Sequence, residues 1–386
     1  MNKNKPKIAM IAMLKGGIGH YIAELSPYLR EDFDLEYISY AYGLPGDKVL
    51  FDDLAIKRNL KSKPFFIIKY NTYQETTASL GAVIAVLKEN KIDILNIHVG
   101  TIARETAYFL ISLVAVCKSM GLKIFYTFHD VEPFEVYTGG EELLRTFYNL
   151  CDFATVGGEN EFKKLVENYA FDRKKLRIAP HGIYKIFDFH KYNQVSSRRH
   201  LGIPADAQVL LNFGIYRPYK GFDDTIKAMP AILEENPKAF LYISSGLRLF
   251  KNIDNLKKLV HDLKLEKNVK FNFEFVDSTE IEPIFKAADV VILPYKQVSQ
   301  SGILNIAYYF NKPMIISNLF IEGAEVDQKA GLVIEPGKSQ NIAEATNLLL
   351  KDSVFYNKCV KNLSQGLRDN DWQKNADIYK ELIQNK

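Results

Sequence analysis

The stretch VLLNFGIYRPYKGFDD, residues 209–224, decides the expected fold of its half of the chain. Its apolar run, Val209–Phe213, is typical of a buried strand, Gly214 allows a turn, and the apolar spacing of Phe222–Leu233 predicts a helix. Arg217 and Lys220 therefore lie at the carboxyl end of a parallel strand, where open α/β sheets bind ligands. Two fixed cations there indicate a pyrophosphate site, although an isolated R-x-x-K in a loop is more often a pair of solvated charges.

The composition is that of a soluble globular protein with more than one core. The chain has 386 residues, of which 47% are hydrophobic and 25% charged, so two domains are expected and disorder is not. The formal charge of +4 is too small to indicate nucleic-acid binding. Two basic runs, Lys57–Lys63 and Arg173–Lys175, are interpreted as solvated faces or as weak contacts with an anionic membrane surface.

Cysteine usage and hydropathy indicate a cytoplasmic protein. The three cysteines, Cys117, Cys151 and Cys359, are far apart and have no paired spacing, so neither a disulfide framework nor a metal site is expected. The first apolar run leads into KGGIGHYIAEL rather than a cleavage site, so it predicts a strand and not a signal peptide. No stretch approaches the roughly 20 apolar residues of a membrane span, so any membrane contact would be peripheral, at the inner face.

The first half alternates short apolar runs with stretches of helical spacing. Strands are expected at Ile8–Leu14, Leu35–Tyr40, Phe65–Ile68, Ile92–His98, Lys123–Phe128, Phe153–Val156 and Leu176–Ile178, and helices at Tyr21–Arg30, Thr76–Lys88, Thr101–Lys118 and Glu161–Tyr169. This alternation predicts a doubly wound parallel sheet. The turn Gly16–His20, with sequence GGIGH, lets backbone N–H groups approach an anion. Its G-G-x-G spacing disfavours an NAD site, which needs G-x-G-x-x-G.

Three histidines follow predicted strands of this first sheet. His20 lies in the first turn, and His98 and His129 end two later strands. A lone histidine is more often structural than functional, but three at one sheet edge could converge on one crevice. His129 and Asp130 are adjacent and so face opposite ways in a strand, and no metal site is predicted.

The second half repeats the alternation after a polar segment, Phe187–His200, which is expected to be a linker. Beyond the opening stretch, strands are expected at Phe240–Ser244, Val269–Phe273, Val290–Pro294, Pro313–Ser317 and Gly331–Ile334, and helices at Leu256–Leu263, Ile281–Ala288 and Ser301–Phe310. The sequence thus predicts an α/β protein with two doubly wound, Rossmann-like domains.

A series of short motifs is distributed along nearly the whole chain. They are Gly16–His20, His129 after a strand, Pro180-His181-Gly182, Gly214 with Arg217 and Lys220, Ala288-Asp289-Val290, Lys312-Pro313, Gly331–Gly337 and Trp372. In this order they resemble the GT-B glycosyltransferases, specifically the large retaining, family 4-like group that uses nucleotide-diphosphate sugars. The resemblance implies an acceptor domain over residues 1–190, a donor domain over residues 200–368 facing it across a cleft, and a helix within residues 369–386 that crosses back to the first domain.

The resemblance also implies roles for individual residues. Arg217 and Lys220 would bind the donor diphosphate and stabilise its departing charge, and His129 would lie beside the donor sugar. The other donor contacts would come from Gly16, Gly17, Gly19, Gly214, the segment from Val276 to Ile281, Ser301, Gly302, Ile303, Leu304 and Asn305. His20, His98 and Glu132 would lie on the acceptor side.

One feature departs from the family pattern. Family members carry two glutamates eight positions apart near the last of these loops, and those positions fall at Val298 and Ile306 here. The stretch Gln300–Asn305 stands there instead. Its hydroxyl and amides are expected to donate to phosphate, and Asn305 to bond a ribose hydroxyl.

The implied chemistry is retaining transfer that needs no cofactor and no metal, because fixed cations would neutralise the diphosphate. The one D-x-D, Asp32-Phe33-Asp34, precedes a strand and so lies at the wrong end of the sheet. An inverting enzyme would need a catalytic carboxylate, for which Glu24, Asp130 and Glu132 are candidates. A nucleotide-sugar isomerase and a non-catalytic partner subunit are the alternative functions. The acceptor would be a glycan, a lipid-linked molecule or a protein.

Overall fold

The computed structural model describes residues 5–12, 14, 16–40, 53–60, 65–68, 73–100, 104–131, 140–246, 253–298, 301–320, 326–366 and 372–384. The chain forms two compact units of similar size. Unit 1 comprises Met1–Gly182 and Asp371–Lys386, and unit 2 comprises Ile183–Asn370. Each unit is described below by itself.

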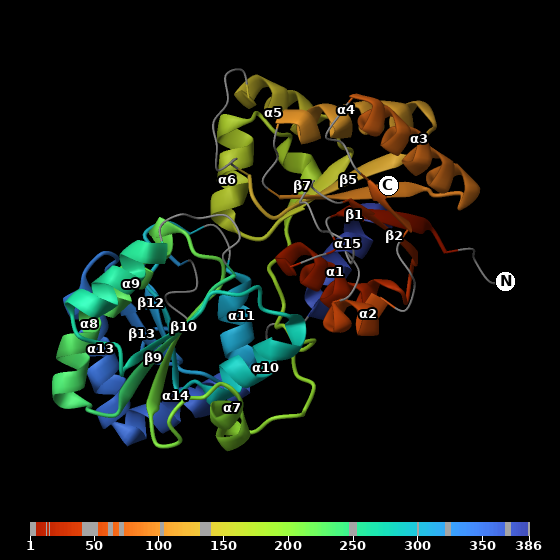
Figure 1. Cartoon of the computed structure of the whole chain (residues 1–386). Helices are drawn as coiled ribbons and strands as arrows, with labels where there is room; N and C mark the ends of the chain where they lie inside the picture. The colour runs from red at the N-terminus through yellow and green to blue at the C-terminus, as the bar shows by residue number, and fades with distance from the viewer. Residues whose placement is uncertain are drawn as a thin grey trace. The chain divides into compact units, whose positions relative to one another are not determined.

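Unit 1 is built on a parallel sheet of seven strands (Figure 1). In spatial order the strands are β3 (Phe65–Ile68), β2 (Asp34–Tyr40), β1 (Lys7–Ala12), β4 (Ile94–Val99), β5 (Lys123–Phe128), β6 (Phe153–Val156) and β7 (Leu176–Ile178). The central strands β1 and β4 are buried along almost their whole length because helices cover both faces of the sheet. The strand order reverses direction between β1 and β4, which makes their carboxyl ends the switch point where such sheets bind ligands.

Two groups of helices cover the sheet of unit 1 (Figure 1). On one face lie α1 (Gly16–Leu29), α2 (Leu54–Leu60) and the last helix of the chain, α15 (Trp372–Gln384). On the other lie α3 (Tyr73–Glu89), α4 (Arg104–Ser119) and α5 (Gly140–Asn149), followed along the chain by α6 (Glu159–Asn168) and the short 3₁₀ helix η1 (Arg173–Lys175). The carboxyl-terminal helix α15 thus packs against α1 within unit 1.

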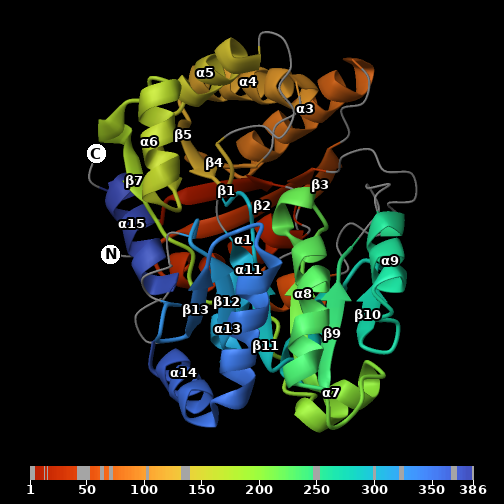
Figure 2. The same ribbon diagram turned by 90° about the vertical axis from the view of Figure 1, so that its left-hand side faces the viewer.

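Unit 2 has a parallel sheet of six strands (Figure 2). In spatial order they are β10 (Val269–Asn272), β9 (Ala239–Ser244), β8 (Gln208–Phe213), β11 (Val290–Leu293), β12 (Met314–Ser317) and β13 (Gly331–Ile334). On one face, α8 (Phe222–Glu235) packs against both α9 (Ile253–Asp262) and α13 (Ser339–Lys351). The other helices are α7 (Gln194–His200), α10 (Ser278–Ala287), α11 (Gly302–Tyr309), α14 (Ser353–Gly366) and the 3₁₀ helix η2 (Pro218–Lys220). The switch point of this sheet lies between β8 and β11.

The predicted turn Gly16–His20 is not a turn, because α1 already begins at Gly16. Pro27 does not interrupt α1 either, although it lacks the N–H that would bond the carbonyl of Ala23. The side-chain amide of Asn59 donates to that carbonyl at 3.2 Å instead. A long-range contact therefore satisfies the backbone group that the proline leaves open.

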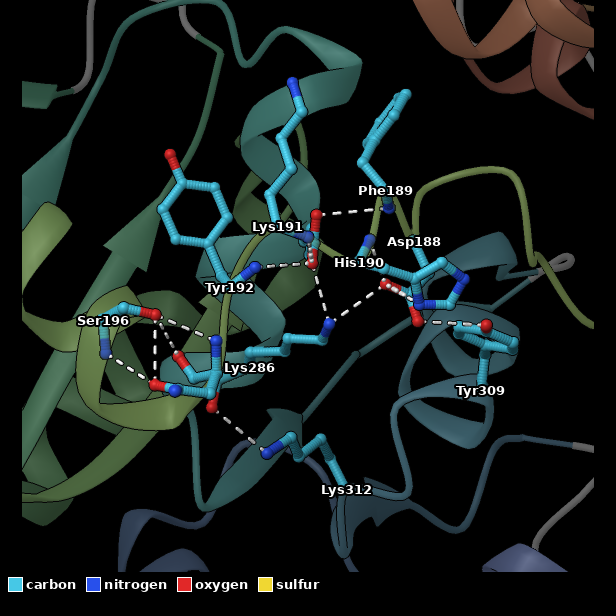
Figure 3. Close-up of polar contacts among 11 residues, drawn as sticks. Asp188, Phe189, His190, Lys191, Tyr192, Ser196, Lys286, Tyr309 and Lys312 are labelled. Carbon is cyan, nitrogen blue, oxygen red and sulfur yellow. Dashed lines mark hydrogen bonds and ion pairs between the residues drawn. The ribbon is translucent and has the colours of Figure 1, made fainter.

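The prediction of an irregular linker over Phe187–His200 is wrong. Its last seven residues form α7, which starts with a reciprocal capping box between Asn193 and Ser196. Before it, the carboxylate of Glu282 accepts hydrogen bonds from the backbone N–H groups of Phe189, Lys191 and Tyr192 (Figure 3). This segment is thus fixed to α10.

Within the described part of the chain, no helix is both long enough and apolar enough to cross a bilayer.

Candidate functional site

The cationic turn after β8 is shaped by two glycines with positive φ. Gly214 has φ 108° and Gly221 has φ 67°, conformations that other residues adopt only with strain. Between them Arg217 precedes η2 and Lys220 ends it. A Cβ atom on Gly221 would lie 2.6 Å from the carbonyl oxygen of Pro294. The turn therefore lies directly against the segment that leaves β11.

Lys220 is a buried cation. It is 9% exposed, and its ammonium lies 5.3 Å from the centre of the Tyr295 ring. Burial, and then the charge of Arg217, lower the pKa of Lys220 to about 8. None of the carboxylates that the structure describes forms an ion pair with it. A buried charge of this kind is costly unless an anion compensates it.

The amino end of α11 meets the same ammonium. A Cβ atom on Gly214 would lie 2.9 Å from Lys220 Nζ and 2.5 Å from Ile303 Cδ1. Ser301 precedes the first turn of α11, which contains no acidic residue. The N–H of Leu304 bonds the carbonyl of Ser301, so an anion here would meet the N–H groups of Gly302 and Ile303. Helix amino termini attract anions through these groups and the helix dipole.

These elements lie together at one corner of unit 2 and could bind an anion there. It combines the backbone at Gly214, the ammonium of Lys220, the neighbouring guanidinium of Arg217 and the amino end of α11. The pairing of fixed cations with helix N–H groups suits a diphosphate, whose charge is spread over several oxygens.

The other predicted donor contacts of unit 2 lie in α10 and α11 or directly before these helices. The segment Val276–Ile281 is mostly helix, because α10 begins at Ser278 and only Val276 and Asp277 precede it. The side chains of Leu304 and Asn305 are buried, as is that of Ile306. Ile306 thus packs as a core residue at the position where the resemblance implies a glutamate.

In unit 1 the structure brings two of the three predicted histidines together. His98 Nδ1 and His129 Nε2 are 3.1 Å apart, and both rings lie against the ring of Tyr21. His181, after β7, completes this cluster at 4.8 Å from Tyr21. His20 is not part of it, because its Nε2 lies 2.8 Å from a carboxylate oxygen of Asp53.

Burial keeps the histidine cluster neutral. It lowers the pKa of His98 to about 3 and that of His181 to about 4, and it holds the pKa of His129 well below the usual value. His98 Nε2 is buried and has no hydrogen-bond partner among the described residues. The cluster therefore presents neutral imidazoles, which donate or accept hydrogen bonds but carry no charge near pH 7.

The glycines at the start of α1 differ in their surroundings. Gly16 has φ 66°, and a Cβ atom on Gly16 or Gly17 would meet no atom within 4 Å. A Cβ atom on Gly19 would lie 2.8 Å from the carbonyl carbon of Leu14 and 2.7 Å from Ile56 Cδ1. Gly19 is therefore required for close packing. Glu132 lies outside the described residues.

Sequence reasoning missed two residues that support the cationic turn. Lys296 Nζ lies 2.8 Å from Asp224 Oδ2, and the Lys296 backbone N–H bonds the carbonyl of Tyr219. Asp224 lies in the first turn of α8, whereas Lys296 follows β11. The only sequence signal for Lys296 is its position three residues after the end of β11, at the same sheet edge as Lys220.

No group of three or more His, Cys, Asp or Glu side chains is arranged to hold a metal ion within the described ranges.

The comparisons with known proteins point to one family. The family described as "Glycosyltransferase Family 4" matches residues 15–184, and that described as "Glycosyl transferases group 1" matches residues 193–365. Together the two matches cover most of the chain.

Among curated proteins, the D-inositol 3-phosphate glycosyltransferase of Kineococcus radiotolerans is 28% identical over 212 residues, which are 52% of this chain and 46% of that protein. The chain spans about half the length of the curated relatives it matches.

Two solved structures share the whole fold. Anabaena HepE in complex with UDP-glucose has a TM-score of 0.74 at 17% identity and covers 98% of this chain and 100% of its own. The sucrose-phosphate synthase of Thermosynechococcus elongatus has a TM-score of 0.73 at 15% identity, with 99% and 100% covered. The predicted fold class, two Rossmann-like domains of the GT-B kind, is confirmed.

Proposed function

Because the chain belongs to the family 4-like GT-B glycosyltransferases, we propose that it moves a sugar from a nucleotide-diphosphate donor to a glycan, lipid-linked or protein acceptor. The observation that carries the proposal is the buried ammonium of Lys220 beside the amino end of α11. Every nucleotide-diphosphate sugar carries a diphosphate that the enzyme must bind, and this corner provides suitable groups.

The proposed mechanism relies on electrostatic stabilisation of the leaving group. As the bond between sugar and phosphate breaks, negative charge grows on the diphosphate and positive charge grows on the sugar ring. Lys220, Arg217 and the N–H groups of Gly302 and Ile303 stabilise the departing diphosphate. Preorganised groups of this kind cost no reorganisation during the reaction, and each contributes about 3 kcal/mol in other enzymes.

We further propose that transfer retains the anomeric configuration and needs no metal ion. The leaving phosphate itself accepts the proton of the acceptor, so no carboxylate base is required. The cations of the turn already supply the positive charge that a metal would bring. His129 and His98, as neutral imidazoles, suit hydrogen bonding to sugar or acceptor hydroxyls.

The test compares Lys220→Met with Lys227→Met, an exposed lysine seven residues further along the chain that pairs with Asp223 at 2.8 Å. UDP-, GDP- and ADP-sugars are offered, and release of the nucleoside diphosphate is measured with and without EDTA. We expect Lys220→Met to lower turnover about 10²–10³-fold, with Lys227→Met and EDTA having little effect. NMR of the product gives the anomeric configuration.

Each competing outcome has its own signature. Full turnover in Lys220→Met would refute the diphosphate site. A donor converted to an isomer without loss of its nucleotide would indicate an isomerase. Donor binding without turnover for any acceptor would indicate a non-catalytic partner subunit.

A further inference from the structure

Residues 184–192, near the start of unit 2, contact α11 at both of its ends. At the amino end, a Cβ atom on Gly302 would lie 3.5 Å from the ring of Tyr184, a side chain that is buried. At the carboxyl end, the hydroxyl of Tyr309, the last residue of α11, donates to Asp188 Oδ2 at 3.1 Å. This segment is called the brace below, because it joins the two ends of one helix.

The brace is fixed to α10 by a chain of charged groups. Figure 3 shows Lys286 of α10 pointing toward Asp188, with 3.0 Å between Nζ and Oδ1. The same ammonium lies 2.7 Å from Glu282 Oε1, and the side chain of Glu282 is fully buried. Its carboxylate also accepts the hydrogen bonds from three backbone N–H groups of the brace. These bonds hold the Asp188 carboxylate in one place, with its second oxygen at the hydroxyl of Tyr309.

The Asp188 carboxylate is suited to this contact because it stays charged. Burial by itself would raise the pKa of Asp188, but hydrogen bonds from Lys286, from the backbone N–H of His190 and from Tyr309 hold that pKa below its ordinary value. A hydrogen bond to an ionised acceptor is stronger than one to a neutral acceptor. The bond between Tyr309 and Asp188 is therefore a firm attachment for the end of α11.

Apolar packing alone leaves the direction of α11 loosely defined. The helix has eight residues, and Ser301 makes no side-chain cap at its amino end. Most residues of α11 are buried, but burial of apolar groups is non-directional, whereas a hydrogen bond favours one geometry. A helix of this length spans about 12 Å, so a shift at one end is carried to the other. The attachment of Tyr309 thus helps to set where the amino end of α11 points.

We propose that Asp188 is a positioning residue for the diphosphate site, acting through Tyr309 and α11. This assignment rests on the proposed function, because the amino end of α11 is the part that meets the leaving group. With the brace in place, the N–H groups of Gly302 and Ile303 stay aligned with the ammonium of Lys220. A site that stabilises developing charge depends on such alignment, because its groups must be in place before the charge appears.

The experiment measures by calorimetry how the full chain binds inorganic pyrophosphate, UDP, GDP and ADP. Tyr309→Phe keeps the ring and removes only the hydroxyl. Tyr356→Phe is the matched control, because the Tyr356 hydroxyl, in α14, donates to the carbonyl of Asp289 at 3.0 Å. We expect Tyr309→Phe to raise the Kd of pyrophosphate and of the tightest nucleoside diphosphate about 3- to 10-fold, the range for one lost hydrogen bond. Tyr356→Phe leaves both within twofold, although the unfolding temperatures of the two variants fall by similar amounts.

A double variant separates positioning from a general loss of packing. Asp188→Ala and Tyr309→Phe break the same hydrogen bond, so their effects on binding should not add. We expect Asp188→Ala combined with Tyr309→Phe to bind pyrophosphate as tightly as Asp188→Ala alone.

Three results would overturn the positioning role while the proposed function stands, because the wild type still binds the probes. They are affinities in Tyr309→Phe within twofold of the wild type, equal losses of affinity in Tyr309→Phe and Tyr356→Phe, and additive losses in the double variant. A wild type that binds neither pyrophosphate nor any of the three nucleoside diphosphates refutes the proposed function and the positioning role together.

Discussion

The amine of Lys220 is buried at the centre of the candidate site, so the affinity for a diphosphate should depend on pH. With a pKa of about 8, its amine is mostly protonated at pH 7 and mostly neutral at pH 9. A bound diphosphate favours the charged form and so raises the pKa. Binding above pH 8 must therefore take up one proton.

We predict that the affinity for the nucleoside diphosphate is nearly constant up to pH 7.5 and then falls, approaching tenfold per pH unit above pH 8. Calorimetry in buffers of different ionisation enthalpy measures the affinity and the proton uptake together. Lys220→Arg provides the control, because a guanidinium stays charged throughout this range. A flat profile in the wild type, or the same fall in Lys220→Arg, would contradict the prediction.

Some contacts between residues of the candidate diphosphate site could be predicted from the sequence, and others could not. Gly214, Arg217 and Lys220 follow one strand within seven residues, so their proximity comes from local chain geometry. The approach of Ile303 follows from parallel strands, whose carboxyl ends share one edge. The contact of Lys296 with Asp224 joins residues 72 positions apart through side chains alone, and no spacing rule indicates it.

The 3₁₀ helix η2, which carries Lys220, is supported by the segment that follows β11. Three contacts make this support: Gly221 against Pro294, the Lys296 N–H to the carbonyl of Tyr219 at 2.6 Å, and Lys296 Nζ to Asp224 at 2.8 Å. Asp224 is buried, and so its pairing with Lys296 is screened less than a surface pair. Lys296 is therefore a positioning residue for Lys220.

We predict that Lys296→Met raises the KM for the donor about 3- to 10-fold, in line with loss of roughly 1 kcal/mol of turn stabilisation. Its effect on kcat is smaller, because Lys220 itself remains. Lys296→Arg should restore most of the affinity. Lys227→Met removes another lysine near Asp223 and Asp224, and it should leave both constants near wild type. Equal effects of Lys296→Met and Lys227→Met would exclude a positioning role.

Elements with strong apolar patterns were predictable, and elements stabilised by polar contacts were not. The strands Phe65–Ile68, Lys123–Phe128 and Gly331–Ile334 have the predicted bounds because their apolar runs stop at polar or glycine residues. Helix α7 was missed because its stability comes from its capping box and from Arg198, which bonds Asp289 at 2.7 Å. The only large apolar side chain of α7, Val195, is 62% exposed, so no apolar stripe marks this helix.

At the scale of the whole molecule, the alternation of strands and helices was enough to predict two doubly wound sheets. The amphipathic pattern does not indicate which polar residues become buried inside them. In unit 1 the hydroxyls of Tyr21, Tyr379 and Thr127 form a buried chain of hydrogen bonds from α1 through α15 to β5. Asn375 extends it from Tyr21 to the carbonyls of Ala179 and Pro180. Tertiary packing alone brings these groups together.

The histidine cluster around Tyr21 gives the two units different responses to acid. His98, His129 and His181 all belong to unit 1, and burial lowers their pKa values. The histidines of unit 2, His190, His200 and His261, are exposed. Below pH 6.5 the unfolded form of unit 1 binds protons that its folded form does not, until the folded pKa values of about 3 to 4 are reached. The free energy of unfolding of unit 1 must then decrease as the pH falls through this window.

We predict that the free energy of unfolding of unit 1 falls by up to about 1.4 kcal/mol per pH unit below pH 6 for each of His98, His129 and His181. Hydrogen exchange at pH 7.5 and pH 5, corrected for the intrinsic exchange rate, should show protection falling more in β4 and β5 than in β8 and β9. Replacing the titrating group in His98→Asn should reduce this slope, whereas His261→Asn, at an exposed histidine, should not. An equal loss of protection in both sheets would show that burial of these imidazoles does not govern the acid response.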